Sequence, residues 1–136
     1  MEIRVSAVAL LRDDAVLLVR KRGTARFMLP GGKFDAAETP RECAMRELRE
    51  ELGIDVDGDA LLPLGHFSAA AANEPGHVVI ADIFMSPLSG APDARAEIEE
   101  LRWFALSEPA TPDLAPLFAQ HVLPRLRERL SPEAQA

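Results

Sequence analysis

The sequence predicts an α/β protein of the α+β type, in which short strands and two helices form a single domain over residues 1–136. Short apolar runs of strand length, separated by turn residues, are spread along much of the chain, and two longer segments carry helix signals. The 136 residues are 48% hydrophobic and 27% charged, which is typical of one globular domain with a core of its own.

The first elements are expected to be three short strands. Apolar residues fill 3–11 and 15–19, and the polar residues between them favour a tight turn, so the fold is predicted to open with a hairpin. A basic loop over residues 20–26 follows. A third strand is expected at 27–29, and Pro30-Gly31-Gly32 is expected to stop it and to let the backbone approach a ligand closely.

A helix is predicted over residues 40–52, with well-defined ends. Thr39 is placed as the N-cap, Pro40 as the first helical residue, and Glu42 as the partner that completes a capping box. Gly53 stands where a left-handed C-terminal cap is expected.

The second half of the chain is expected to contain strands and a final helix. The expected elements are, in order, hairpin strands at 61–72 and 77–85, a loop at 86–94, a strand at 97–106 and a helix at 113–130. Pro124 should bend or restart that helix because proline lacks an N–H and clashes with the preceding turn. Residues 131–136 are expected to fray.

Charge and cysteine content limit the classes of partner. A formal net charge of −7, with no basic stripe to offset it, disfavours nucleic acid as a partner. Cys43 is the only cysteine, which excludes an internal disulfide and a cysteine-based metal cluster. The apolar run at 5–11 is too short to cross a membrane and lacks a cleavage pattern, so we expect a cytoplasmic protein without a membrane partner.

The predicted helix at 40–52 carries a group of acids. Glu47, Glu50 and Glu51 fall within one arc of a helical wheel, and an apolar stripe with Leu48 and Leu52 lies on another side. The acids are therefore expected at the edge of a cleft and not buried outright. Their oxygen atoms would suit Mg²⁺ or Mn²⁺. The alternative is an ordinary solvated helix face, because such charge runs are common on surfaces.

The residues around this helix resemble the signature of the Nudix hydrolases, G-x5-E-x7-R-E-U-x-E-E-x-G-U, in which U is a bulky aliphatic residue. The constrained positions are filled by Gly32, Glu38, Arg46, Glu47, Leu48, Glu50, Glu51, Gly53 and Ile54. The resemblance implies an α/β/α sandwich with a mixed sheet. It also implies Mg²⁺-dependent hydrolysis, with Mn²⁺ as a substitute, of a pyrophosphate bond in a nucleoside di- or triphosphate or a related diphosphate-linked metabolite.

By the same resemblance, Glu47, Glu50 and Glu51 are metal ligands or carry the general base, and Arg46 orients the glutamates. The carbonyl of Gly31 is expected as a further metal ligand. An acid that lies six residues before Trp103 completes the set, which gives Glu97. Its neighbours Glu99 and Glu100 are left as alternatives, since a one-residue shift in alignment would change the assignment.

Substrate binding is assigned to two groups of residues. The basic residues Arg20, Lys21, Arg22 and Arg26 precede the glycine turn and are candidates to clamp phosphates, or else are ordinary loop charges. The loop residues Gly32, Lys33 and Glu38 are expected to contact the same substrate.

Substrate choice and assembly are only coarsely predicted. A small nucleotide or nucleotide-like molecule is expected as substrate, and the protein as a monomer or homodimer. Leu114 stands where relatives specific for oxidised guanine carry an asparagine, which argues against that specificity. The second hypothesis for function is a catalytically silent Nudix-fold module that binds a nucleotide as a sensor.

Overall fold

A computed structural model describes residues 1–130, so the predicted fraying of 131–136 lies outside the described residues. Six strands form one mixed sheet in the order β4-β5-β1-β2-β6, and β3 pairs with β1 beside this path. The strands are β1 (Glu2–Arg12), β2 (Ala15–Lys21), β3 (Gly31–Lys33), β4 (Leu62–Ala70), β5 (Val78–Pro87) and β6 (Ile98–Ala105). The helical segments are α1 (Pro40–Leu52), the short η1 (Gly58–Ala60), η2 (Phe118–Val122) and α2 (Leu123–Arg129).

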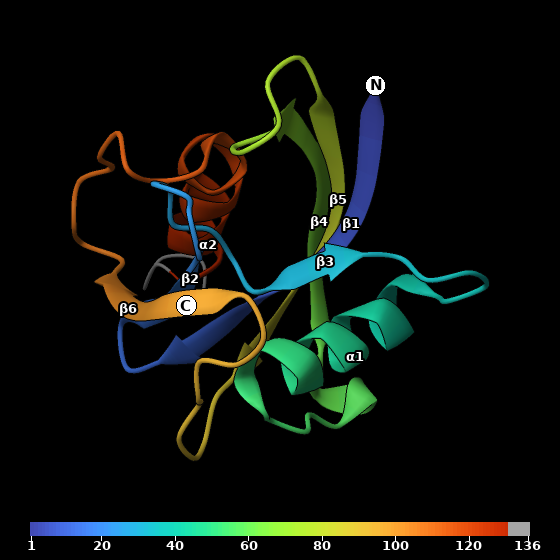
Figure 1. Cartoon of the computed structure of the whole chain (residues 1–136). Coiled ribbons are helices and arrows are strands. Elements are labelled where there is room, and N and C mark those ends of the chain that lie inside the picture. The colour runs from blue at the N-terminus through green and yellow to red at the C-terminus, as the bar shows by residue number, and fades with distance from the viewer. Residues whose placement is uncertain (131–136) are drawn as a thin grey trace.

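Strand β1 is the centre of the sheet and changes partner along its length. It pairs in parallel with β5 from Glu2 to Leu11 on one side. On the other side it pairs with β3 over residues 5–7 and with β2 only at residues 11 and 12. β1 and β2 are therefore separated along most of β1, and the segment that carries β3 lies between them next to α1 (Figure 1).

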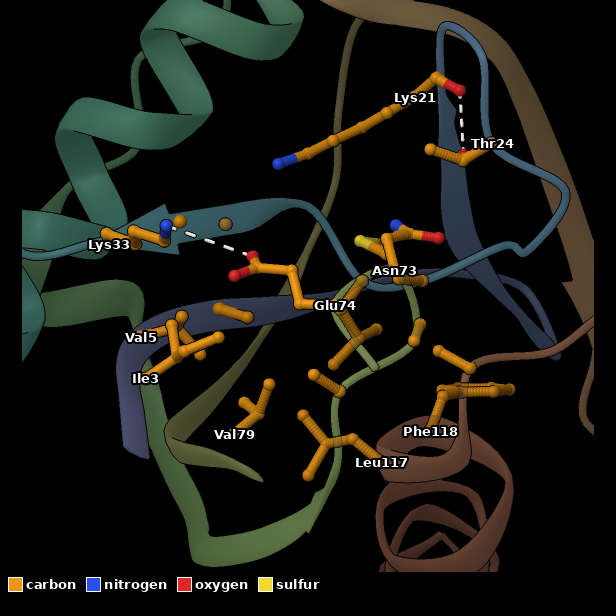
Figure 2. A pocket seen from close by; sticks show the side chains of 18 of the residues that line it. Ile3, Val5, Lys21, Thr24, Lys33, Asn73, Glu74, Val79, Leu117 and Phe118 are labelled. Carbon is orange, nitrogen blue, oxygen red and sulfur yellow. Dashed lines mark hydrogen bonds and ion pairs between the residues drawn. The ribbon is translucent and has the colours of Figure 1, made fainter. Parts of the chain in front are cut away.

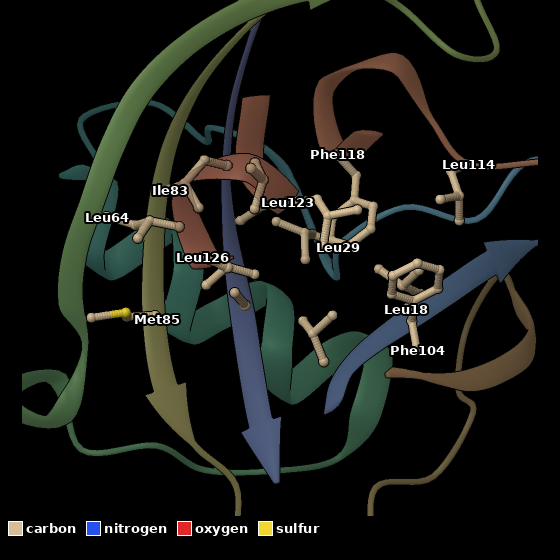
Figure 3. Packing of buried hydrophobic residues seen from close by; sticks show 14 of the residues in the cluster. Leu18, Leu29, Leu64, Ile83, Met85, Phe104, Leu114, Phe118, Leu123 and Leu126 are labelled. Atoms are coloured by element: carbon tan, nitrogen blue, oxygen red, sulfur yellow. The ribbon is translucent and has the colours of Figure 1, made fainter. Parts of the chain in front are cut away.

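The side chains of β1 alternate between two hydrophobic clusters, one on each face of the sheet. Val8 and Leu10 pack toward α1, whose Leu48 is fully buried in the same cluster. Ala9 faces the opposite cluster, which η2 and α2 cover with the fully buried residues Phe118, Val122, Leu123 and Leu126 (Figure 3). This arrangement confirms the predicted α/β/α sandwich with a mixed sheet.

Helix α1 begins and ends at the residues that the sequence predicts. The Thr39 hydroxyl accepts a hydrogen bond from the Glu42 amide at 3.1 Å, and the Glu42 carboxylate accepts one from the Thr39 amide at 2.9 Å. Gly53 adopts a left-handed conformation (φ 67°) and its amide donates to Arg49 O. These caps satisfy backbone groups that a helix leaves unpaired at its ends.

The predicted strand at 27–29 is wrong. Residues 27 and 28 make only isolated bridges, and the strand in this region is instead the glycine segment that was expected to stop it. The reason is close packing, since a Cβ on Gly31 would lie 2.6 Å from the Ala7 Cα. Without a side chain at 31, the backbone can pair directly with β1.

The C-terminal helix begins later than predicted. Residues 112 and 113 form a turn, Leu114 bridges to Phe27, and the helical residues begin at Pro116. The predicted break near Pro124 is confirmed: η2 is a π-helical segment in which Leu123 N donates to Phe118 O, directly before α2. Among residues 1–130, no helix has both the length and the apolar character needed to cross a membrane.

Candidate active site

A cleft of about 550 Å³ lies between the β3–α1 segment, the tip of the β4–β5 hairpin and the start of the C-terminal helices. Charged residues, among them Lys21 and Glu47, line one part of it. Figure 2 shows the Lys21 side chain reaching in from one side and the apolar residues Ile3, Val79 and Leu117 on the opposite side. The cleft therefore offers charged groups and an apolar wall to one ligand.

Glu51 is the most deeply placed acid of the cleft, with an exposed fraction of 6%. Its Oε1 accepts a hydrogen bond from the Gly31 amide at 3.0 Å. Burial raises the pKa of this carboxyl from 4.5 to about 7, although the Gly31 hydrogen bond and the charge of Lys21 act in the opposite direction. The expectation that no acid of the helix is buried outright is wrong for Glu51, because the backbone of β3 covers it.

Glu47 lies one helical turn earlier and faces the same cleft. Its carboxylate is in contact with Gly32, where an added Cβ would lie 2.5 Å from the Glu47 Cδ. Burial raises the pKa of the Glu47 carboxyl, and the hydrogen bond from Arg46 lowers it. Both acids are thus held in positions where their negative charge is poorly solvated.

Arg46 connects the helix to the loop that precedes it. Its guanidinium donates to Glu38 at 2.7 and 3.0 Å, to Glu47 at 3.0 Å and to Glu50 at 3.1 Å, and it also reaches the Lys33 carbonyl at 3.0 Å. The hydrogen bonds from Arg46 are the largest cause that lowers the pKa of Glu38 to about 2. Neither Glu38 nor Glu50 lines the cleft, and the Glu50 side chain is 53% exposed.

Three acids near the start of β6 differ in whether they line the cleft. Glu97 lines the cleft, and its negative charge contributes to the raised pKa of Glu51. Glu99 pairs with Arg22 at 3.7 Å and Glu100 pairs with Arg20 at 3.0 Å, and neither lines the cleft. The geometry therefore favours Glu97 among the three alternatives.

The basic residues that were predicted to contact the substrate do not all line the cleft. Lys21, Arg22 and Lys33 line the cleft, whereas Arg20 and Arg26 do not. A bulge between Arg20 and Lys21 shifts the register of β2 against β6, and such bulges redirect side chains. The charge of Lys21 acts on both Glu47 and Glu51, which makes it the cation most directly linked to the acids.

Comparison with known proteins identifies the family. Residues 2–126 match the NUDIX domain model. The chain belongs to the NUDIX family. It is 34% identical over 114 residues to a mouse (Mus musculus) protein named oxidized purine nucleoside triphosphate hydrolase, a match that covers 80% of this chain and 70% of the relative.

Two further relatives of this NUDIX chain show the spread of the family. An ADP-ribose pyrophosphatase of Methanocaldococcus jannaschii is 28% identical over 99 residues, which is 71% of this chain and only 57% of that protein's length. The crystal structure of a MutT NUDIX hydrolase from Burkholderia pseudomallei superposes with a TM-score of 0.74 at 26% identity, covering 96% of this chain and 99% of the other.

The donor set of the NUDIX cleft fits a hard divalent cation. Glu47, Glu51, Glu97 and the Gly31 carbonyl offer only oxygen ligands. Burial, which raises the pKa of Glu47 and of Glu51, leaves their negative charge poorly solvated, and a bound cation would offset that charge. Within residues 1–130, no three acidic, histidine or cysteine side chains already converge as a ready-made metal site. The Glu47 carboxylate would have to exchange part of its Arg46 contact for the cation.

Several residues that line the cleft have no sequence signal that would have predicted their place there. Asn73 and Glu74 come from the hairpin turn and Phe118 from η2, and all three line the cleft. The Asn-Glu-Pro-Gly turn is visible in the sequence, but not that Asn73 and Glu74 line the same cleft as residues of β1. Neither Phe27 nor Phe67 lines the cleft, so neither is placed to stack on a base bound there.

Proposed function

We propose that this protein is a pyrophosphohydrolase of nucleotides or nucleotide-like metabolites and that it depends on a divalent cation, Mg²⁺ or its substitute Mn²⁺. The observation that carries the proposal is that Glu47, Glu51 and Glu97 line the same cleft as the Gly31 backbone and Lys21. An isolated solvated helix face would not place two partly desolvated carboxylates beside a lysine. Of the three relatives named above, the mouse protein and the Methanocaldococcus protein are also hydrolases of nucleotide-type molecules by name.

The chain's own acids would hold the cation and accept a proton. Glu51, Glu47, Glu97 and the Gly31 carbonyl are the proposed ligands, with Glu50 able to join only by turning away from Arg46. When bound, the cation would neutralise charge on the phosphates and lower the pKa of the attacking water. Glu47 or Glu51 is the proposed proton acceptor, since burial brings their pKa values closer to neutral pH.

Positioning would be the task of Arg46 and of the cationic side chains. Arg46 and Glu38 fasten the loop over residues 33–38 to α1, which keeps Glu47 beside Gly32. Lys21, Arg22 and Lys33 are the proposed phosphate contacts because they line the cleft. Arg20 and Arg26 are not proposed as phosphate contacts, because they do not line the cleft.

The opposite wall would receive the nucleoside. Its residues Ile3, Val79 and Leu117 are apolar, which suits the face of a base or sugar. The side chain of Leu114 is 3% exposed and packs in the core, so it offers no hydrogen bond to an oxidised base. We therefore do not propose specificity for oxidised guanine, although one relative bears a name that includes oxidised purine substrates.

A hydrolysis panel with metal added tests the proposal. Purified protein is incubated with Mg²⁺ and with nucleoside triphosphates, sugar nucleotides, dinucleoside polyphosphates or ADP-ribose, and released phosphate or pyrophosphate is measured. Glu97→Gln is expected to lose most activity, whereas Glu99→Gln, a matched change two residues later on β6 and outside the cleft, is expected to keep it. Ligand-induced thermal shifts without turnover would instead support a silent binding module.

A further inference from the structure

The end of α1 is bonded to the loop that leads into β6 (Figure 1). The Asp93 amide donates to the Leu52 carbonyl at 3.0 Å, and the Arg95 amide donates to the Glu51 carbonyl at 2.9 Å. A helix leaves its last carbonyls without partners inside the helix, and these two bonds satisfy them. The backbone of Glu51, whose side chain lines the cleft, is thus bonded directly to the loop that carries Glu97.

The side chain of Arg95 lies over Gly53, the residue that ends α1. A Cβ added at Gly53 would be 2.5 Å from Arg95 Nε, so a side chain at this position would displace the guanidinium. A positive charge beside the carbonyl end of a helix is favourable. The Arg95 side chain is 54% exposed, and its ion-pair partner, Asp93 at 3.5 Å, belongs to the same loop. Packing over the glycine therefore holds the arginine against α1, whereas its ion pair does not.

A tight turn between Arg95 and β6 fixes the backbone of Glu97. The Ile98 amide donates to the Arg95 carbonyl at 3.0 Å, and Ala96 between them has a φ of 54°. This left-handed conformation is uncommon for a residue that carries a side chain. The Arg22 amide donates to the Glu97 carbonyl at 2.8 Å. Glu97 is thus held from two directions, by the residue after β2 and, through Arg95, by α1.

We propose that Arg95 is a positioning residue of the cation site, which sets the place of Glu97 relative to Glu51 without touching the cation or the substrate. Arg95 does not line the cleft, whereas both acids do. Replacement of residues that orient metal ligands typically weakens metal binding by roughly 10–100-fold. The inference rests on the proposed function and adds to it what holds Glu97, the proposed ligand that lies outside α1. Gly53 leaves the space that this role requires.

Binding of Mn²⁺ to the metal-free protein tests this role without any substrate. The full chain is titrated with Mn²⁺, and free Mn²⁺ is measured by electron paramagnetic resonance. Arg95→Ala is expected to raise the Kd for Mn²⁺ about tenfold, because Glu97 is no longer held in place. Since the Arg95 side chain is half exposed and outside the core, the melting temperature in EDTA should stay within about 2 °C of the wild type.

Arg49→Ala is the matched control. Arg49 lies in the last turn of α1, is 60% exposed, pairs with Asp55 and does not line the cleft. The two variants lose the same positive charge, and this loss by itself favours the binding of a cation. The Kd for Mn²⁺ should therefore be unchanged or slightly lower in Arg49→Ala, in contrast to the increase expected for Arg95→Ala.

A second background separates positioning of Glu97 from a general effect on the fold. Glu97→Gln alone should weaken Mn²⁺ binding at least as much as Arg95→Ala does. If Arg95 acts through Glu97, adding Arg95→Ala to Glu97→Gln should cause no further loss, since the two effects are then not additive. Ala96→Val places a β-branched residue at a positive φ and should show the same pattern, which provides a second variant if Arg95→Ala fails to fold.

The outcomes separate this inference from the proposed function. An unchanged Kd in folded Arg95→Ala, or an equal loss with Glu97 and with Gln at this position, overturns the inference alone. If Glu97→Gln binds Mn²⁺ as tightly as the wild type, the inference and the assignment of Glu97 as a ligand both fail. A wild type that neither binds Mn²⁺ nor hydrolyses any member of the panel overturns the proposed function and the inference together.

Discussion

The burial of Glu51 implies a specific dependence of folding stability on pH. Its pKa is raised from 4.5 to about 7 in the folded protein, so the folded state holds the proton more tightly than the unfolded chain. Below pH 4.5 the group is protonated in both states and has no effect. As pH rises toward 7 the unfolded chain ionises first, and the free energy of unfolding falls by up to about 3 kcal/mol.

Glu51→Gln removes this penalty. Glutamine stays neutral at every pH and keeps an oxygen that can accept from the Gly31 amide. The variant is therefore expected to match the wild type near pH 4.5 and to be more stable by about 3 kcal/mol at pH 8, or roughly 10 °C in melting temperature for a chain of this size. Under the proposed function, the same variant loses most hydrolytic activity.

Urea unfolding in EDTA at several pH values between 4.5 and 8 measures the difference. Glu50→Gln is the control, since the exposed Glu50 side chain carries little desolvation penalty and its replacement breaks an ion pair with Arg46. Mg²⁺ added at pH 8 should raise the melting temperature of the wild type more than that of Glu51→Gln. A stability difference that is equal at pH 4.5 and pH 8, or a Gln variant less stable at pH 8, would refute the reasoning.

Other predictions follow from the placement of single residues. Lys21→Ala should lower kcat/KM by about 10–100-fold through a lost charged contact, whereas Arg20→Ala, outside the cleft, should change it by less than about threefold. Gly32→Ala should displace the Glu47 carboxylate and reduce kcat by up to about 100-fold, with a stability change below about 1 kcal/mol in urea unfolding, since a flexible side-chain end can move. Leu126→Ala, on the buried face of α2, should cost about 2–5 kcal/mol in the same unfolding assay but leave kcat/KM of the folded protein unchanged. A large loss of kcat in Leu126→Ala, or a Gly32→Ala variant that keeps the kcat of the wild type, would contradict these assignments.

The ends of α1 could be predicted to the residue because every signal for them is local. Thr39, Pro40, Glu42 and Gly53 each act within one helical turn, and their effects do not depend on the rest of the fold. The two hairpins and the late strand were predictable for a similar reason, since apolar runs between turn residues mark them.

The features that the sequence did not disclose depend on contacts between distant segments. The glycine strand β3 exists only because β1 is beside it, and its backbone then buries Glu51. The separation of Lys21 from Arg20 depends on a bulge opposite β6, about eighty residues later in the chain. Neither the pairing of β1 with β3 nor the bulge between β2 and β6 can be predicted from local residue patterns.

The residues of the cleft come from several separate parts of the chain. The proposed metal ligands and the lysines belong to the end of β2, β3, α1 and the start of β6, while Asn73 and Glu74 sit in a hairpin turn and Leu117 precedes η2. Changes of sequence or length in that turn would remodel what the cleft accepts without moving the acids. The scaffold thus separates the ability to react from the choice of molecule, which makes the β4–β5 turn the natural place to redesign selectivity.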